Sequence, residues 1–217
     1  MGTIPGRQLY SVRESYRILY YGLRTIGYLA RARRKNEMSR DFIERIMLAV
    51  TGVHDCAVCS HGHAKMALEA GMSADEIRDL LAGVMDDVPA GELPAVLFAQ
   101  HYADSRARPS RESWEWVVDL YGLSRARGIL GAIRMIMVGN TYGITLGSLV
   151  NRFRGRPDLR SSLSYELSMM LGLVLFLPVA LVHALISELS GAPLIWFEAD
   201  RPVPAAGSPA VTSPDTQ

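Results

Sequence analysis

Apolar residues recur at helical spacing along most of this chain, and no segment alternates apolar and polar residues as a half-buried strand does. From Ser11 to Arg34 they follow one another at intervals of three or four residues, which predicts an amphipathic helix. Capping serines, glycines and prolines divide the following sequence into further segments of helical pattern. Helices are predicted over residues 39–52, 56–70, 74–82, 94–105, 112–121 and 124–151. The pattern therefore predicts an all-α fold.

Single residues predict several of the helix boundaries. Gly52 is expected to end the helix that Ser39 caps, and Asp55 is expected to be the N-cap of the next helix. Within the long segment 124–151, Gly139 and Gly143 are expected either to interrupt the helix or to let it pack closely against a neighbour.

The length of 217 residues suits one core domain with appendages. We expect a flexible N-terminus at residues 1–10, a helical domain at 11–160, an apolar helical segment at 161–199 and a disordered tail at 200–217.

The charge and cysteine content indicate which class of partner and which cellular compartment to expect. Twenty-three Lys and Arg residues nearly balance 22 Asp and Glu residues, so the broad basic surface of a nucleic-acid-binding protein is not expected. Residues 1–10 contain no apolar stretch, so no cleaved signal is expected. Two cysteines at CxxC spacing suggest a reducing compartment, which predicts a cytoplasmic protein.

Residues 167–187 contain no Asp, Glu, Lys or Arg, and a stretch of roughly 20 apolar residues can cross a bilayer. Arg152, Arg154, Arg156 and Arg160 precede this stretch, and the positive-inside rule would leave the preceding domain in the cytoplasm. A helix that is apolar all round is also typical of a large core or an oligomer. The sequence leaves both alternatives open, a membrane anchor and a buried helix.

The four residues Glu44, Cys56, Cys59 and His63 form the most informative motif. A cysteine acts as a nucleophile in its thiolate form, and a helix N-terminus stabilises that form. Cys56, Cys59 and His63 share one face of the predicted helix, where the imidazole can reach the second sulfur. We therefore expect Cys59 to attack a substrate, Cys56 to resolve the product to a disulfide, and Glu44 to orient or deprotonate His63.

Two other interpretations of the motif remain. The cysteines can be a pair of small buried apolar residues, because cysteine is among the most buried residue types. They can also bind zinc with His54, His61 or His63, although structural zinc sites usually draw on two separated ligand pairs.

The pattern Glu44-x11-Cys56-x2-Cys59-x3-His63 resembles the alkylhydroperoxidase AhpD-like branch of the carboxymuconolactone decarboxylase family, which is all-helical. The resemblance implies that Cys59 attacks peroxide, that Cys56 resolves it, and that Glu44 and His63 relay a proton. It also implies homo-oligomers and re-reduction by a lipoyl protein or another dithiol donor, with no bound cofactor.

Two features depart from that branch. Val58 stands where many peroxidase members have a histidine, and the apolar segment 161–199 lies outside the familiar core. The decarboxylases of the family do not depend on a CxxC pair, so lactone decarboxylation is not expected. We predict a dithiol peroxidase or thiol–disulfide oxidoreductase that reduces hydroperoxides. The alternative is a non-catalytic CxxC module that senses redox state or binds metal, tethered to a membrane or assembled into an oligomer.

Overall fold

A computed structural model describes residues 9–197 of the chain. Of the predicted flexible N-terminus only Leu9 and Tyr10 lie in this range, and the predicted tail 200–217 lies outside it. Residues 9–197 form helices and no strand, which confirms the all-α prediction. The helices are α1 (Val12–Arg34), α2 (Arg40–His54), α3 (Ala57–Glu69), α4 (Ala74–Ala82), α5 (Leu93–Asp104), α6 (Arg111–Phe153) and α7 (Leu163–Leu189).

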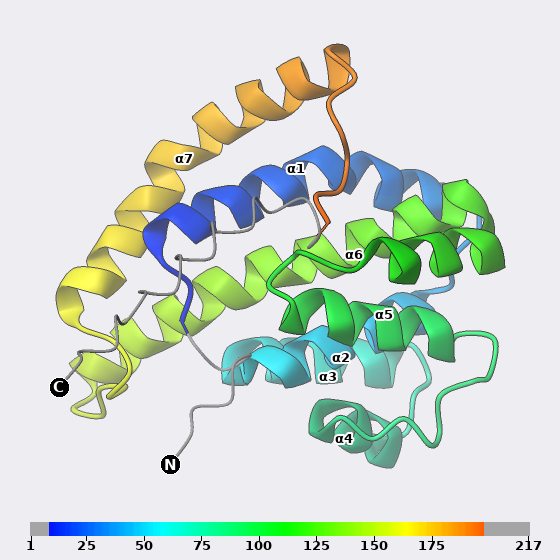
Figure 1. Ribbon diagram of the computed structural model, residues 1–217. Coiled ribbons are helices and arrows are strands. Elements are labelled where there is room, and N and C mark those ends of the chain that lie inside the picture. Colours follow the sequence, from blue (N-terminus) through cyan, green and yellow to red (C-terminus); the bar gives the residue numbers. More distant parts are fainter. Residues whose placement is uncertain (1–8, 198–217) are drawn as a thin grey trace, which may run out of the picture.

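The long helix α6 is the centre of the fold. It packs against α1, α2, α3, α5 and α7. In Figure 1, α1 and α7 lie on one side of α6, while α2, α3 and α5 lie on the other and α4 is at the far edge. The core is therefore built on both sides of one helix.

Serine side chains begin most of the helices. The Ser11 hydroxyl accepts a hydrogen bond from the Glu14 backbone N–H, while the Glu14 carboxylate accepts one from the Ser11 N–H at 2.9 Å, which completes a capping box. Four other helices each have a serine N-cap that accepts from a backbone N–H in the first turn: Ser39, Ser73, Ser110 and Ser162.

Helix α6 is continuous except at Gly122. There the backbone leaves helical geometry, with φ 73° and ψ 154°, close to the predicted break between residues 121 and 124. A positive φ is accessible to glycine because it has no Cβ. The helix continues through Gly139 and Gly143 without interruption, so the alternative in which these glycines break it is wrong.

Close packing between α1 and α6 depends on glycine. A Cβ added to Gly131 would lie 2.9 Å from both the Leu29 Cβ and the Thr25 carbonyl oxygen. A Cβ on Gly128 would lie 2.6 Å from the Ala32 Cβ. The two helices therefore approach more closely at these positions than any larger residue allows.

Two predicted boundaries next to the cysteines are wrong. Helix α2 does not end at Gly52 but continues to His54, and Gly52 is required because a Cβ there would lie 2.6 Å from the Leu81 carbonyl oxygen. Asp55 is not the N-cap of α3. It is the C-cap of α2 in the left-handed conformation (φ 56°, ψ 49°), which aspartate tolerates better than most residues, and Cys56 becomes the N-cap of α3.

An arginine on α2 joins three parts of the fold. Arg45 is buried and forms ion pairs with Asp41 at 2.6 Å, with Glu76 of α4 at 2.6 Å and with Glu92, which precedes α5, at 2.8 Å. Because all three acids converge on one guanidinium, α2 has a fixed position relative to α4 and α5.

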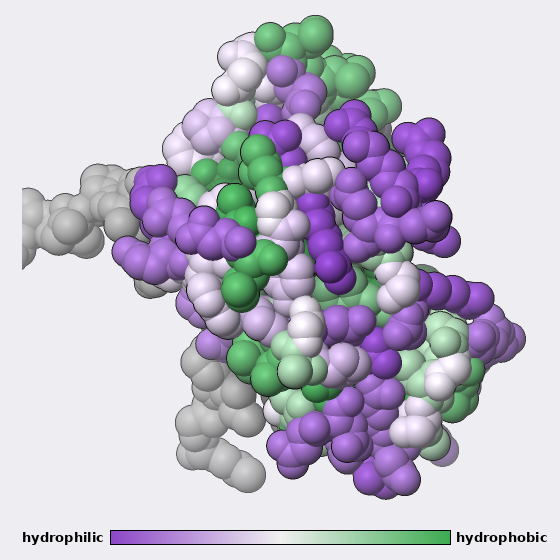
Figure 2. Space-filling model, turned by 90° about the vertical axis from the view of Figure 1, so that its right-hand side faces the viewer, coloured by the Kyte–Doolittle hydropathy of each residue, from purple (hydrophilic) through white to green (hydrophobic). Residues whose placement is uncertain are grey.

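Helix α7 is largely exposed. Both α6 and α7 are long and apolar enough to cross a membrane, but such helices also occur in soluble cores, and α6 is mostly buried in the protein. Only 22% of the most apolar window of α7 is buried, so the buried-helix alternative does not hold within one chain. Figure 2 shows apolar side chains gathered at the top of the molecule, where Figure 1 places the C-terminal end of α7.

The glycine contacts give a matched pair of substitutions on α6. We expect Gly131→Ala to lower the free energy of unfolding by about 1–3 kcal/mol, because its Cβ overlaps α1. Gly139→Ala should be neutral or raise it by up to about 1 kcal/mol, because Gly139 is exposed and alanine favours helix. Urea denaturation of both variants tests this, and equal stabilities would contradict the packing described.

Candidate functional site

Cys56 and Cys59 form a disulfide at the N-terminus of α3. The Cys56 Sγ caps the helix by accepting a hydrogen bond from the Cys59 backbone N–H at 3.3 Å. Cys56 is fully buried, whereas Cys59 is half-buried. Of the two sulfur-bearing residues, Cys59 is thus the one that solvent reaches. Both lie where unpaired N–H groups and the helix dipole favour negative charge, and hence a thiolate once the bond is reduced.

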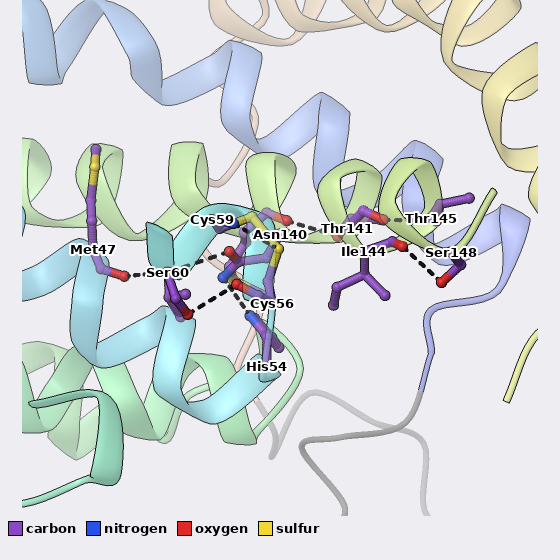
Figure 3. Close-up of a disulfide and its surroundings, with 12 residues drawn as sticks. Met47, His54, Cys56, Cys59, Ser60, Asn140, Thr141, Ile144, Thr145 and Ser148 are labelled. Carbon is purple, nitrogen blue, oxygen red and sulfur yellow. Dashed lines mark hydrogen bonds between the residues drawn. A yellow bond between two sulfur atoms is a disulfide. The ribbon is translucent and has the colours of Figure 1, made fainter. Parts of the chain in front are cut away.

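Helix α6 packs directly on the disulfide at Gly143. A Cβ at this position would lie 2.7 Å from the Cys59 Sγ and 3.2 Å from the Cys56 Sγ. Figure 3 shows α6 passing beside the two sulfur atoms. One turn later, a Cβ on Gly147 would lie 3.3 Å from a methyl carbon of Val58. Gly143 therefore allows the close packing that the sequence left as an alternative.

Glu44 and His63 form a polar pair between α2 and α3. The His63 Nδ1 lies 2.8 Å from a carboxylate oxygen of Glu44, and both side chains are largely buried, with 17% and 7% exposed. When Nδ1 carries a proton it donates to the carboxylate, which fixes the orientation of the ring. The predicted Glu44–His63 contact is present.

The four predicted site residues thus lie on two adjacent helices. Cys59 and His63 are four residues apart on α3, which places them on one face and roughly 6 Å apart along the axis. Glu44 reaches that face from α2. His61, on the same helix, is exposed.

A second polar group lies next to the cysteines. His54 is the last residue of α2 and is 3% exposed. Its Nδ1 accepts a hydrogen bond from the Asn140 side-chain amide at 3.0 Å, so the neutral ring carries its proton on Nε2 and donates to the Tyr10 hydroxyl at 2.7 Å. Figure 3 places His54 and Asn140 beside Cys56.

No pattern in the sequence indicates this second group. His54 had no assigned part beyond a candidate zinc ligand, and its partners Tyr10 and Asn140 lie 44 and 86 residues away along the chain. Only the tertiary fold brings Asn140 of α6 and Tyr10, which precedes α1, to the end of α2.

The zinc alternative finds no support in the side-chain arrangement. Within residues 9–197 no group of three or more His, Cys, Asp or Glu side chains is placed to hold a metal ion. His54 has its ring nitrogens in hydrogen bonds to Asn140 and Tyr10.

Comparison with known protein families matches residues 22–104 to the carboxymuconolactone decarboxylase family. The match covers less than half of the chain but includes all four predicted site residues. It excludes α6 and α7, including the glycine that packs on the disulfide. No curated protein and no solved structure matches the chain. Membership of the AhpD-like branch stays a prediction.

The buried His54 makes stability depend on pH. Burial lowers its pKa to about 4, and the nearby Arg106 acts in the same direction. Above the unfolded value of about 6.5 the ring is neutral in both states, and below it only the unfolded chain binds the proton. We therefore expect the free energy of unfolding to fall by about 3 kcal/mol between pH 6.5 and pH 4 through this residue.

Urea denaturation across this pH range tests the expectation by comparing the wild type with His54→Gln. The variant should lose this part of the pH dependence, whereas His61→Gln, which changes an exposed histidine, should keep it. Parallel profiles for the wild type and His54→Gln would contradict the assignment.

Proposed function

We propose that this protein reduces hydroperoxides through the Cys56–Cys59 dithiol and is a dithiol-dependent peroxidase. The observation that carries the proposal is the arrangement of the four residues, a CxxC disulfide at a helix N-terminus next to a Glu44–His63 pair. The disulfide and the family match fit a redox role. The choice of peroxide as the oxidant is supported by the resemblance of the four-residue pattern to the AhpD-like alkylhydroperoxidases.

In the first step the Cys59 thiolate attacks the terminal oxygen of the hydroperoxide. A sulfur–oxygen bond forms, the oxygen–oxygen bond breaks, and the alkoxide leaves as an alcohol after taking a proton. The greater exposure of Cys59 supports this assignment, because an external substrate reaches it before the buried Cys56. A protonated His63, held by Glu44, is the proposed proton donor.

In the second step Cys56 attacks the sulfenic acid on Cys59. The sulfur–sulfur bond forms, the sulfur–oxygen bond breaks, and hydroxide leaves as water with the proton of the Cys56 thiol. The product is the disulfide present in the structure. Two electrons from an external dithiol, a lipoyl protein or a similar donor, reduce it again by thiol–disulfide exchange. The cycle needs no bound cofactor, because the dithiol carries the electrons.

The proposal also covers the cellular compartment and the oligomeric state of the protein. Regeneration by a dithiol donor requires a reducing compartment, so we place the site in the cytoplasm. We also propose a homo-oligomer, on the family resemblance alone.

The nucleophile assignment predicts different behaviour for the two serine variants. Cys59→Ser should lose peroxide turnover by at least about 1,000-fold, because the attacking atom is gone. Cys56→Ser should consume one equivalent of peroxide per chain and form no intramolecular disulfide. Peroxide consumption with a panel of dithiol donors measures both.

Two results would contradict the proposal. Turnover by Cys59→Ser at the wild-type rate would remove its role. Slow stoichiometric oxidation of the wild type, with no turnover with any donor, would favour the redox-sensor alternative.

The proton relay predicts a change in thiol titration. We expect Glu44→Gln and His63→Ala to raise the apparent pKa of the reduced thiol by about 1 unit. His63→Ala removes the imidazole near the thiolate, and Glu44→Gln removes the carboxylate that holds this imidazole in place. Thiolate absorbance against pH measures the shift, with the exposed His61→Ala as the matched control. A titration that is the same in all four proteins would eliminate the relay.

A further inference from the structure

The outer face of α7 is a broad apolar surface. Residues 167–187 include no charged side chain, and ten large apolar residues among them are exposed. These are Leu167, Leu171, Val174, Leu175, Leu177, Val179, Leu181, Val182, Leu185 and Ile186. Exposed apolar surfaces of this extent, continuous along one element, indicate contact with something other than water.

The width of this surface distinguishes among possible occupants. At 100° per residue, the exposed positions cover an arc of about 200°, from Leu177 to Val179 around the helix. A helix packed on one partner helix buries a stripe of roughly 100°. A second copy of α7 would thus leave much of the arc in water. A lipid layer in which half of the helix circumference is immersed would cover the whole arc.

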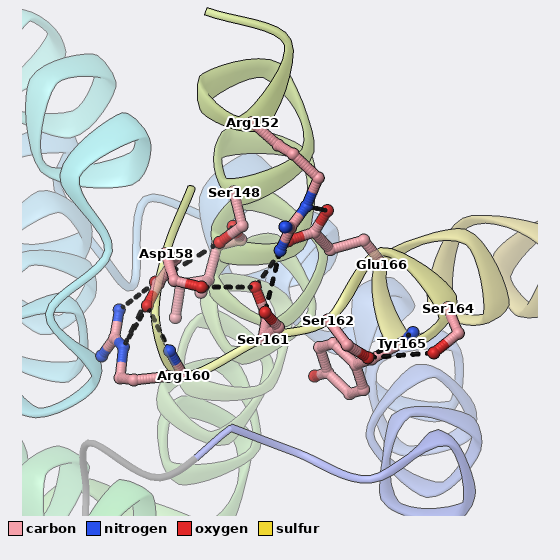
Figure 4. Close-up of polar contacts among 10 residues, drawn as sticks. Ser148, Arg152, Asp158, Arg160, Ser161, Ser162, Ser164, Tyr165 and Glu166 are labelled. Atoms are coloured by element: carbon pink, nitrogen blue, oxygen red, sulfur yellow. Dashed lines mark hydrogen bonds and ion pairs between the residues drawn. The ribbon is translucent and has the colours of Figure 1, made fainter. Parts of the chain in front are cut away.

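The opposite face of α7 is fixed to the protein along its length. At its start the buried Glu166 pairs with Arg152 at 2.8 Å (Figure 4). Near its end Ser187 accepts a hydrogen bond from the Tyr20 hydroxyl at 2.9 Å, and Glu188 accepts one from Tyr28 at 2.8 Å. Crossing a bilayer would separate α7 from these partners or carry α1, with its arginines, into the lipid.

The chain after α7 is held in the same way. Arg24 of α1 donates to the carbonyl oxygens of Ala192 at 3.0 Å and Pro193 at 2.7 Å. Both ends of α7 are thus attached to one side of the protein. This arrangement fits a helix that lies in the plane of a membrane surface rather than one that spans it.

The loop between α6 and α7 has the chemistry of a lipid-headgroup contact. Arg154 and Arg156 are exposed, and within the described residues no ion pair is formed by either. Phe153, the last residue of α6, and Leu159, in the loop, are 79% and 98% exposed. Arginines beside exposed apolar side chains are typical of segments that bind anionic lipid surfaces.

We propose that α7 is an in-plane membrane anchor. Its exposed arc lies among the acyl chains of one leaflet, and Arg154 and Arg156 contact anionic headgroups. In Figure 1, α1 and α6 lie between α7 and α3, so a bilayer against α7 leaves the disulfide on the water side. The anchor therefore leaves access for a soluble reductant, and it stands independently of the peroxidase proposal.

Flotation with lipid vesicles tests the anchor. The full chain should float with vesicles of phosphatidylcholine and phosphatidylglycerol, and Leu171→Asp/Leu185→Asp should reduce the bound fraction at least about tenfold. The matched control is Leu97→Asp/Leu120→Asp, which adds the same charge at exposed leucines of α5 and α6 and should bind like the wild type. Arg154→Gln/Arg156→Gln should weaken binding to the anionic vesicles by about fivefold per arginine.

Three outcomes would overturn the proposal. One is a wild type that stays with the soluble fraction. Another is an α7 variant that floats as well as its control. The third is a concentration-dependent dimer that Leu171→Asp/Leu185→Asp dissociates without any vesicle binding, which would assign the surface to a second copy.

A labelling experiment separates an in-plane helix from a spanning one. Ser164→Cys and Ser190→Cys place single thiols near the two ends of α7, in a Cys56→Ser/Cys59→Ser background. In sealed membranes, an impermeant maleimide should label both positions from the same side. Labelling of only one end would show that α7 crosses the bilayer and would refute the in-plane arrangement.

Discussion

The contact between Gly143 and the two sulfur atoms is the constraint on which the site depends. Any other residue at position 143 would displace the disulfide or the helix, because its Cβ would lie only 2.7 Å from the Cys59 Sγ. The same helix carries Asn140 one turn earlier, where its amide holds His54 beside Cys56. The position of α6 thus sets both the packing of the sulfurs and the polar group next to them.

Because α6 also packs on α1 and α7, it separates the fold into two sides. On one side α2 and α3 carry the dithiol and the Glu44–His63 pair. On the other side α1 carries α7 with its apolar outer face. The proposed redox chemistry and the proposed membrane contact therefore lie on opposite sides of the fold, and neither requires the residues of the other.

Local signals in the sequence were enough to predict the all-α class, the serine caps and the break near Gly122, because each depends on a few neighbouring residues. The Glu44–His63 contact could also be predicted, since both residues belong to adjacent helices in a spaced motif. The helix boundaries at Gly52 and Asp55 could not. Gly52 is set by the approach of the Leu81 backbone, and Asp55 by a left-handed turn into Cys56.

Contacts between distant segments could not be predicted from the sequence either. The partners of His54 come from residues on two other segments, and the contact of Gly143 with the cysteines joins α6 to α3. The exposure of α7 depends on which of its faces α1 covers, and composition alone carries no such information. These features follow from tertiary packing.

The proposed mechanism requires the Cys59 Sγ to be the atom that reacts with the oxidant. Its most direct test is mass spectrometry of the reduced Cys56→Ser protein after one equivalent of an organic hydroperoxide, with dimedone present to trap sulfenic acid. We expect a dimedone adduct on Cys59, and a much slower or absent adduct on Cys56 in the reciprocal Cys59→Ser protein. Unmodified Cys59 with peroxide left in solution, or equally fast modification of Cys56 in the reciprocal protein, would contradict it.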